Sequence, residues 1–179
     1  MAILPGDLKK KQLIEQMIRV DHAGEYGAKQ IYLGQLSVLK NSQDQQLLKH
    51  MAAQEEVHLD YFTKSIQQRR VRPSILMPIW HVFGYVLGKA SASLGKNSAM
   101  ICTEAVEEVI NDHYKEQFVQ LKEINELDLA ENIEKFRQEE LEHHDIAKAN
   151  MSNLNLGHKL LYQAIKLGCK ISIGLARKL

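Results

Sequence analysis

The sequence has few of the features that define several classes of protein. It contains only two cysteines, Cys102 and Cys169, in 179 residues, and they form no C-x-x-C pair. This argues against a disulfide framework and against a thiolate metal site. The 23 basic and 22 acidic side chains leave a net charge of +1, so no nucleic-acid footprint is present. No Gly-x-Gly-x-x-Gly motif occurs either, so we expect any reductant to be external.

No apolar run is long enough to cross a bilayer as a helix, which needs roughly 20 apolar residues. The segment from Pro73 to Gly88 comes nearest, but two prolines and two glycines interrupt it. It is either a buried core helix or an element that lies in a membrane interface, and Trp80 and Tyr85 favour the interface. We therefore expect residues 73–94 to form an apolar interfacial segment.

What the sequence does contain indicates one folded domain over residues 1–179. Its composition, 45% hydrophobic and 25% charged, is ordinary for a globular protein. Apolar residues recur with helical spacing and no strand alternation competes, which predicts an all-α fold with a four-helix core and additional helices. Five residues are candidate first residues or caps of these helices. They are Asp7, Ser42 (with Gln45 as a capping box), Gly95, Asn125 and Asn155.

Two Glu-x-x-His units carry the chemistry. Residues three apart project from one face of a helix, so each unit can hold one metal ion. Each unit follows a lone glutamate by about thirty residues, which matches the ligand set of ferritin-like di-iron bundles. The six candidate metal ligands are Glu25, Glu55, His58, Glu107, Glu140 and His143.

The same spacing indicates an internal repeat of two helical hairpins. Superposing Glu25 on Glu107 also places Tyr32 on Tyr114. The second pair of ligand segments superposes with Glu, His and Asp in register. We therefore predict a duplicated hairpin in a ferritin-like bundle.

The candidate ligands lie on stripes that face the core. Glu55, for example, shares its stripe with Met51 and Phe62. Buried carboxylates are costly unless they are compensated, and two divalent cations would cancel four negative charges. Carboxylate and imidazole donors favour iron, with manganese left open. We expect Glu25 and Glu107 to be the bridging or shifting carboxylates.

The last helix, residues 155–179, is predicted to be basic and amphipathic. Its apolar face includes Leu161, Ile171 and Leu175, and its opposite face carries Lys166 and Lys170. An ordinary surface helix packed on the bundle would have the same pattern. In combination with segment 73–94, the pattern favours peripheral attachment to a membrane surface and an apolar substrate.

Longer motifs follow one another in a specific order along nearly the whole chain. They are RVDHAGEYGA at 19–28, RVRP at 70–73, LMP at 76–78, VEE at 106–108, HY at 113–114 and FRQEELEHHD at 136–145.

Together these motifs resemble the demethoxyubiquinone hydroxylase family of ubiquinone biosynthesis. The resemblance implies a membrane-associated di-iron monooxygenase that hydroxylates the ring of a polyprenyl demethoxyquinol with O2. It also implies that His113 and Tyr114 act near the substrate and in the reduction chemistry. Tyr114 as a plain core aromatic remains the alternative to this role.

Several alternatives stay open from the sequence. A ferritin-like ferroxidase would use a related site, and a helical membrane scaffold would need no core carboxylates. Gln54 and Glu139 are candidates to orient the ligand histidines, or are solvated polar residues. His144 is expected to be a surface or packing residue.

The location and the partners are expected from the same features. Residues 1–6 lack the character of an export or transit peptide. This favours the cytoplasmic face of a bacterial inner membrane, with the matrix side of the mitochondrial inner membrane as the alternative. A lipid-binding accessory protein and a homo-oligomer are further possible partners, whereas no nucleic acid is expected.

Overall fold

The described part of the chain forms six α-helices. The computed structural model describes residues 9–40 and 42–179, and no β-strand occurs in these ranges. The all-α prediction is therefore confirmed. The helices are α1 (Lys10–Val38), α2 (Ser42–Arg69), α3 (Met77–Ser93), α4 (Lys96–Glu123), α5 (Leu127–Ala149) and α6 (Leu156–Lys178).

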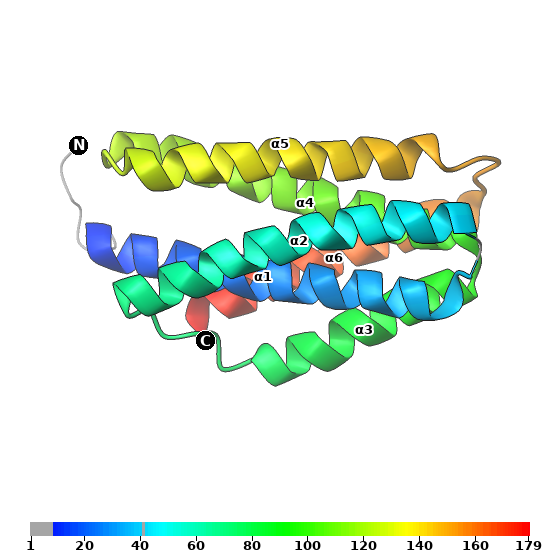
Figure 1. The fold of residues 1–179 in the computed structure, drawn as a ribbon, viewed down its shortest axis with the longest axis horizontal. Coiled ribbons are helices and arrows are strands. Elements are labelled where there is room, and N and C mark those ends of the chain that lie inside the picture. Colours follow the sequence, from blue (N-terminus) through cyan, green and yellow to red (C-terminus); the bar gives the residue numbers. More distant parts are fainter. Residues whose placement is uncertain (1–8, 41) are drawn as a thin grey trace.

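Four long helices form the bundle, and two more are added to one side of it (Figure 1). Helices α1 and α2 form one hairpin and α4 and α5 form the other, and the two hairpins meet through α1 with α4 and α2 with α5. This is the predicted ferritin-like arrangement of duplicated hairpins. Helix α3 packs on α1 and α4, and α6 packs on α4 and α1.

Two apolar clusters fill the bundle on either side of the candidate ligands. One contains Ile18, Phe62 and Phe136, and the other contains Met51 and Met100. On each bundle helix the ligands fall between a residue of one cluster and a residue of the other. Apolar packing therefore holds all four helices just above and just below the polar layer, which fixes where the ligand side chains meet.

Glycines allow α3 to approach α1 closely. A Cβ placed on Gly88 would overlap the carbonyl oxygen of Ile31, and one on Gly84 would lie 2.7 Å from the carbonyl oxygen of Gly27. Contacts this short with rigid backbone leave no room for a side chain. The Gly84-x-x-x-Gly88 pattern thus serves close helix packing.

Most of the predicted helix ends are found, and one is corrected. Gly95 precedes α4 with φ of 106°, and the side chain of Asn155 caps α6 by accepting from the backbone N–H of His158. Asn125 was predicted to cap α5, and this is wrong. It has φ of 54° and closes the end of α4, while Glu126 precedes α5. Asp7 lies outside the described residues.

The C-terminal helix buries a narrower stripe than its sequence pattern indicates. Ile165 and Ala176 are the buried residues of α6, whereas Ile171 and Leu175 of the predicted apolar face are exposed. Along the described part of the chain, every helix is too short or too polar to traverse a bilayer.

Candidate metal centre

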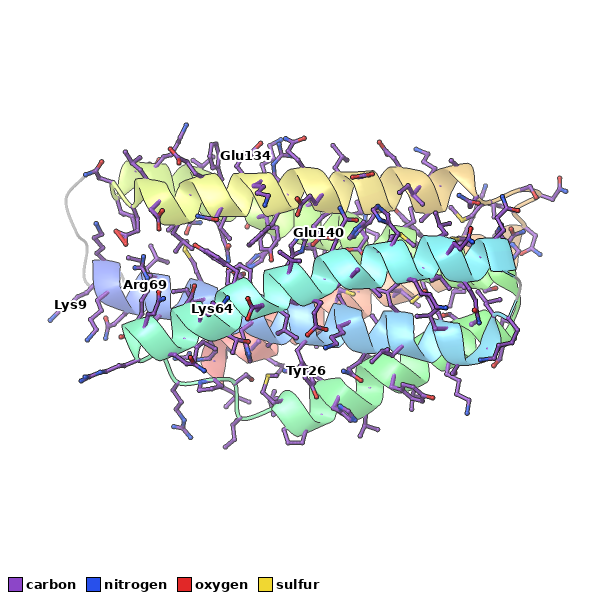
Figure 2. The ribbon with its side chains drawn as sticks, in the orientation of Figure 1. Lys9, Tyr26, Lys64, Arg69, Glu134 and Glu140 are labelled. Atoms are coloured by element: carbon purple, nitrogen blue, oxygen red, sulfur yellow. The ribbon has the colours of Figure 1, made fainter. Side chains whose placement is uncertain are left out.

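The structure brings all six candidate ligands together in the middle of the bundle. They form two groups, and within each group one possible ligand atom per residue lies within 4.8 Å of the others. None of the six side chains is more than 1% exposed. Figure 2 shows Glu140 between α5 and α2, whereas Glu134 of the same helix lies on its outer side. The groups are Glu25, Glu55, His58 and Glu140, and Glu55, Glu107, Glu140 and His143.

Two glutamates belong to both groups. Glu55 and Glu140 are shared, whereas Glu25 and Glu107 each belong to one group. This arrangement favours Glu55 and Glu140 as the residues that would contact both ions, whereas the sequence suggested Glu25 and Glu107 as bridging or shifting carboxylates; the bridging role stays a prediction. The reason is geometric, because the shared pair comes from α2 and α5, which face each other across the bundle.

The donor atoms fit a pair of cations. Both oxygens of Glu55 and one oxygen each of Glu25, Glu107 and Glu140 are buried without a hydrogen-bond partner. Leaving such groups unpaired costs free energy, and cations would compensate them. Carboxylate and imidazole donors suit iron or manganese. Metal binding by these residues remains a prediction that the geometry supports.

The electrostatics of the metal-free cluster show the same need for positive charge. Burial and the nearby charge of Glu140 raise the pKa of Glu55 and of Glu107 well above the usual value. Burial also raises the pKa of Glu140, but its interactions with His143 and His58 outweigh this and hold that pKa below its usual value. Without metal, burial and mutual repulsion therefore favour the protonated form of Glu55 and Glu107.

Each ligand histidine is oriented by the opposite hairpin. His58 Nε2 lies 2.6 Å from Glu139 Oε2, and His143 Nε2 lies 2.9 Å from Gln54 Oε1. The Nδ1 atoms of both rings are directed at the carboxylates, with His58 Nδ1 at 3.0 Å from Glu140 Oε1. The orienting role considered for Gln54 and Glu139 matches these contacts, although each acts across the bundle and not on its own helix.

We expect these outer contacts to control metal affinity. Glu139→Ala or Gln54→Ala should weaken Fe(II) binding about 10- to 100-fold, because the histidine ring loses the acceptor that orients it. Glu139→Gln keeps an oxygen acceptor and should lose less Fe(II) affinity than Glu139→Ala. Anaerobic titration calorimetry measures the affinities, with the exposed Glu142→Ala as the control. Wild-type affinity in both alanine variants would contradict the assignment.

Two tyrosines also contact candidate ligands on the opposite hairpin. Tyr114 on α4 donates a hydrogen bond to Glu25 on α1, and Tyr32 on α1 donates one to Glu107 on α4 at 2.8 Å. The sequence superposition pairs these tyrosines, but Tyr32 was not predicted as a site residue. Its spacing of seven residues from Glu25, equal to that of Tyr114 from Glu107, was the available signal.

The remaining candidate histidines lie outside both ligand groups. His113 stacks on Tyr114 with ring centroids 6.3 Å apart and contacts Gln117 and Asp21, so it adjoins the site without reaching it. His144 lies 2.9 Å from Asp145 Oδ1, in agreement with the expected packing role.

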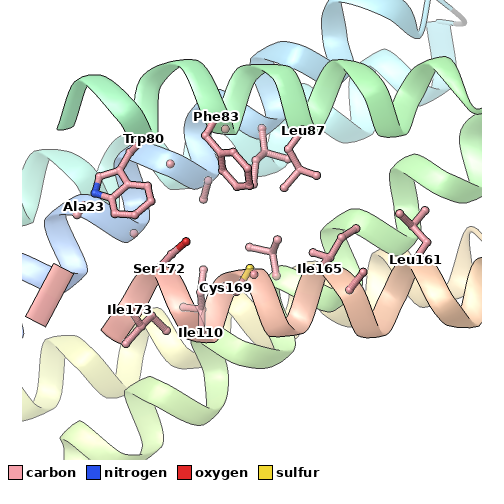
Figure 3. Close-up of a pocket in the computed structure, with 18 residues that line it drawn as sticks. Ala23, Trp80, Phe83, Leu87, Ile110, Leu161, Ile165, Cys169, Ser172 and Ile173 are labelled. Atoms are coloured by element: carbon pink, nitrogen blue, oxygen red, sulfur yellow. The ribbon is translucent and has the colours of Figure 1, made fainter. Parts of the chain in front are cut away.

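An apolar cavity of about 300 Å³ lies beside the ligand layer. Its walls are α3 and α6, as Figure 3 shows, with Trp80, Phe83 and Leu87 on one side and Ile165 and Cys169 on the other. Its inner surface is formed by α1 and α4. Gly24 and Val106 line it there, directly before the ligands Glu25 and Glu107 in the sequence. The cavity thus borders the part of α1 and α4 that carries these two ligands.

Comparison with known proteins agrees with the motifs. Residues 12–176 match the model of the family described as ubiquinone biosynthesis protein COQ7. The 3-demethoxyubiquinol 3-hydroxylase of Rhodospirillum rubrum is 48% identical over 176 residues, covering 98% of this chain and 82% of that protein.

Eukaryotic relatives are similar over the same length. The NADPH-dependent 3-demethoxyubiquinone 3-hydroxylase of Homo sapiens mitochondria is 44% identical over 169 residues, which cover 93% of this chain and 78% of that protein. The mitochondrial 5-demethoxyubiquinone hydroxylase of Saccharomyces cerevisiae is 35% identical over 182 residues, with 93% and 78% covered. The comparisons do not support the ferroxidase alternative better than the hydroxylase. The chain belongs to the COQ7 family of ubiquinone biosynthesis proteins.

Proposed function

We propose that this protein is a monooxygenase that hydroxylates the ring of a polyprenyl demethoxyquinol, using O2 and an external reductant. The observation that carries the proposal is the cluster of six buried ligands beside an apolar cavity. The names of the relatives supply the reaction class, and the cavity accommodates the apolar substrate that this class requires.

Two iron ions are the cofactor we propose for this cluster. When bound, they would supply the electrons and the O2 activation that ring hydroxylation requires. Glu25 and His58 would hold one ion, Glu107 and His143 the other, and Glu55 and Glu140 both. Tyr32 and Tyr114 would restrain the unshared carboxylates through their hydrogen bonds.

The walls of the cavity position the substrate. Small residues of α1, among them Gly24, Gly27 and Ala28, leave room for a planar ring next to the helix that carries Glu25. Leu87 and Leu161 offer apolar surface for an isoprenoid tail further along α3 and α6. An apolar lining of this kind also keeps water away from the substrate, which limits side reactions.

We further propose that the outer surface of α3 and α6 lies on a membrane. Val82 and Val86 on α3 and Leu167 and Ile171 on α6 are all more than half exposed. An apolar surface of this kind is unfavourable in water and favourable at the headgroup boundary. Because the same two helices form the cavity walls, a lipid-dissolved quinol could enter from the bilayer.

The location and the further partners follow as proposals of the same kind. Bacterial and mitochondrial relatives support the cytoplasmic face of a bacterial inner membrane, or the matrix side of the mitochondrial inner membrane, as the proposed location. A lipid-binding accessory protein that presents the substrate, and a homo-oligomer, are compatible with this surface.

Membrane attachment predicts a specific binding defect. Val82→Lys combined with Val86→Lys should reduce co-sedimentation with lipid vesicles at least about 10-fold, because two charges would be driven into the headgroup boundary. Val57→Lys is the matched control, since Val57 is also exposed and α2 makes no contact with α3 or α6. Equal binding of all variants would contradict the proposed surface.

The function itself is tested with labelled oxygen. Iron-loaded protein is given a chemical reductant, a short-chain demethoxyquinol and ¹⁸O₂, and the quinone is analysed by mass spectrometry. We expect one ¹⁸O atom in the ring of the product. Catalytic oxidation of Fe(II) without any ring product would overturn the hydroxylase proposal in favour of a ferroxidase.

A further inference from the structure

A second, polar pocket of about 130 Å³ lies at the junction of α1, α4 and the last turn of α6. Glu116, Gln120 and Arg177 line it together with His113 and Gln117. In contrast to the cavity between α3 and α6, its lining carries hydrogen-bonding and charged groups. A pocket of this size and polarity has room for several water molecules.

A buried carboxyl lies behind this pocket. Asp21 is only 3% exposed, and its Oδ1 accepts a hydrogen bond of 2.7 Å from Gln117 Nε2. His113 Nε2 lies 3.4 Å from the same oxygen and 2.9 Å from Gln117 Nε2. The other oxygen of Asp21 and the amide oxygen of Gln117 are buried without a partner. Two unpaired acceptors at this point mark a place where a donor such as water is needed.

Asp21 also adjoins the ligand layer. It precedes Glu25 by four residues on α1, so the two carboxyls lie one turn apart on the same helix face. Burial raises the pKa of Asp21, although its contact with His113 opposes this. The carboxyl therefore holds a proton more readily than an exposed aspartate does.

The groups that face His113 come from three helices. Asp21 approaches its ring from α1, Gln117 from α4 and Arg177 from α6, where Arg177 Nη2 lies 3.4 Å from His113 Nδ1. Gln16 holds this end of α6 by donating to the backbone oxygen of Arg177 at 3.0 Å. The C-terminal turn thus forms one wall of the pocket, and His113 lies between that wall and Asp21.

The proposed reaction creates a demand for protons. Conversion of a ring C–H to C–OH by O2 consumes two electrons from the reductant and two protons, and it releases one water molecule. The substrate cavity is apolar, so it offers no chain of hydrogen bonds for proton movement. A separate polar route must reach the ligand layer.

We propose that Asp21 and His113, held in place by Gln117, form this route and bring protons from the polar pocket to the metal centre, apart from the path of the quinol. The inference rests on the proposed function, and it assigns Asp21 a role that the metal-ligand motif does not contain. Protons would enter at the pocket beside Arg177 and pass between His113 and Asp21, whose carboxyl lies one helical turn from the ligand layer.

The decisive variant is Asp21→Asn, which keeps the size of the side chain but cannot carry a proton. We expect hydroxylation to fall at least about 10-fold, with a larger rate ratio between H2O and D2O than in wild type. Iron content and unfolding temperature should stay unchanged. His113→Ala should also slow turnover, and imidazole, which can enter the pocket, should restore part of the rate. His144→Ala is the control and should show neither effect.

A second readout needs no turnover. Infrared spectra of the iron-loaded protein, in which the ligand carboxyls are ionised, should contain a protonated carboxyl band that disappears in Asp21→Asn and shifts rapidly in D2O, because the pocket gives water access. If wild type and His144→Ala form no product, the proposed function fails and this inference with it. If they form product and Asp21→Asn retains the wild-type rate and isotope ratio, only the proton route is overturned. Loss of iron in Asp21→Asn without imidazole rescue of His113→Ala would reduce both residues to a structural role and likewise overturn it.

Discussion

Replacement of Glu140 by alanine is expected to abolish ring hydroxylation. Glu140 belongs to both ligand groups, so its loss removes a donor from each metal ion at once. The activity should fall by more than the roughly 10- to 100-fold that the loss of an outer hydrogen-bond partner costs. The measurement is quinone profiling of cells that lack their own hydroxylase and express the variant, together with the iron content of the purified protein.

The same α5 helix supplies the control for this prediction. Glu142 is exposed, two residues from Glu140, and Glu142→Ala should restore ubiquinone as well as wild type does. Glu25→Ala, which removes a donor from one group only, should leave partial iron binding. Equal ubiquinone from Glu140→Ala and wild type would show that the proposed site is wrong.

Leucine at Gly88 should destabilise the fold more than any other change proposed for α3. Its Cβ alone would overlap the carbonyl oxygen of Ile31, so α3 must move away from α1. Overpacking against rigid backbone costs about 3 kcal/mol, which corresponds to a decrease of roughly 6–12 °C in the unfolding temperature for a chain of this size. Thermal unfolding followed by circular dichroism measures the change.

A glycine without such a neighbour provides the comparison. No atom lies within 4 Å of a Cβ built on Gly174, so Gly174→Ala should be neutral or stabilise the helix by up to about 1 kcal/mol. Because Gly84 and Leu87 line the cavity, Gly88→Leu should also weaken binding of the quinol analogue. An unchanged unfolding temperature would mean that α3 does not pack on α1 as described.

The six candidate ligands could be predicted because their spacing is a local property of helices. Glu55 and His58 share a face whatever their helix packs against, and so do Glu140 and His143. The stripes of Met51 and Phe62 around Glu55 indicate in the same local way that this face is buried. The helical class and the caps at Gly95 and Asn155 are local as well.

The features that the sequence left undecided, and the one helix cap that it misplaced, concern relations between helices. Which glutamates are shared depends on how α2 and α5 are rotated toward each other, and no spacing within one helix contains that rotation. Asn125 illustrates the same limit on a smaller scale. An asparagine between two helices can cap the second or end the first, and here its positive φ assigns it to the end of α4.

The chain's own pattern of residues was thus sufficient for the helical class, the buried faces of the helices that carry the candidate ligands, and the identity of these ligands. Only the folded arrangement decided the contacts between opposite hairpins, such as Glu139 with His58 and Tyr32 with Glu107. It also decided which carboxylates belong to both ligand groups, where the apolar cavity lies, and that Asp21 lies beside His113. The physical reason is that the periodicity of a helix specifies which side chains project from the same face. The packing of several helices specifies which side chains of other helices that face contacts.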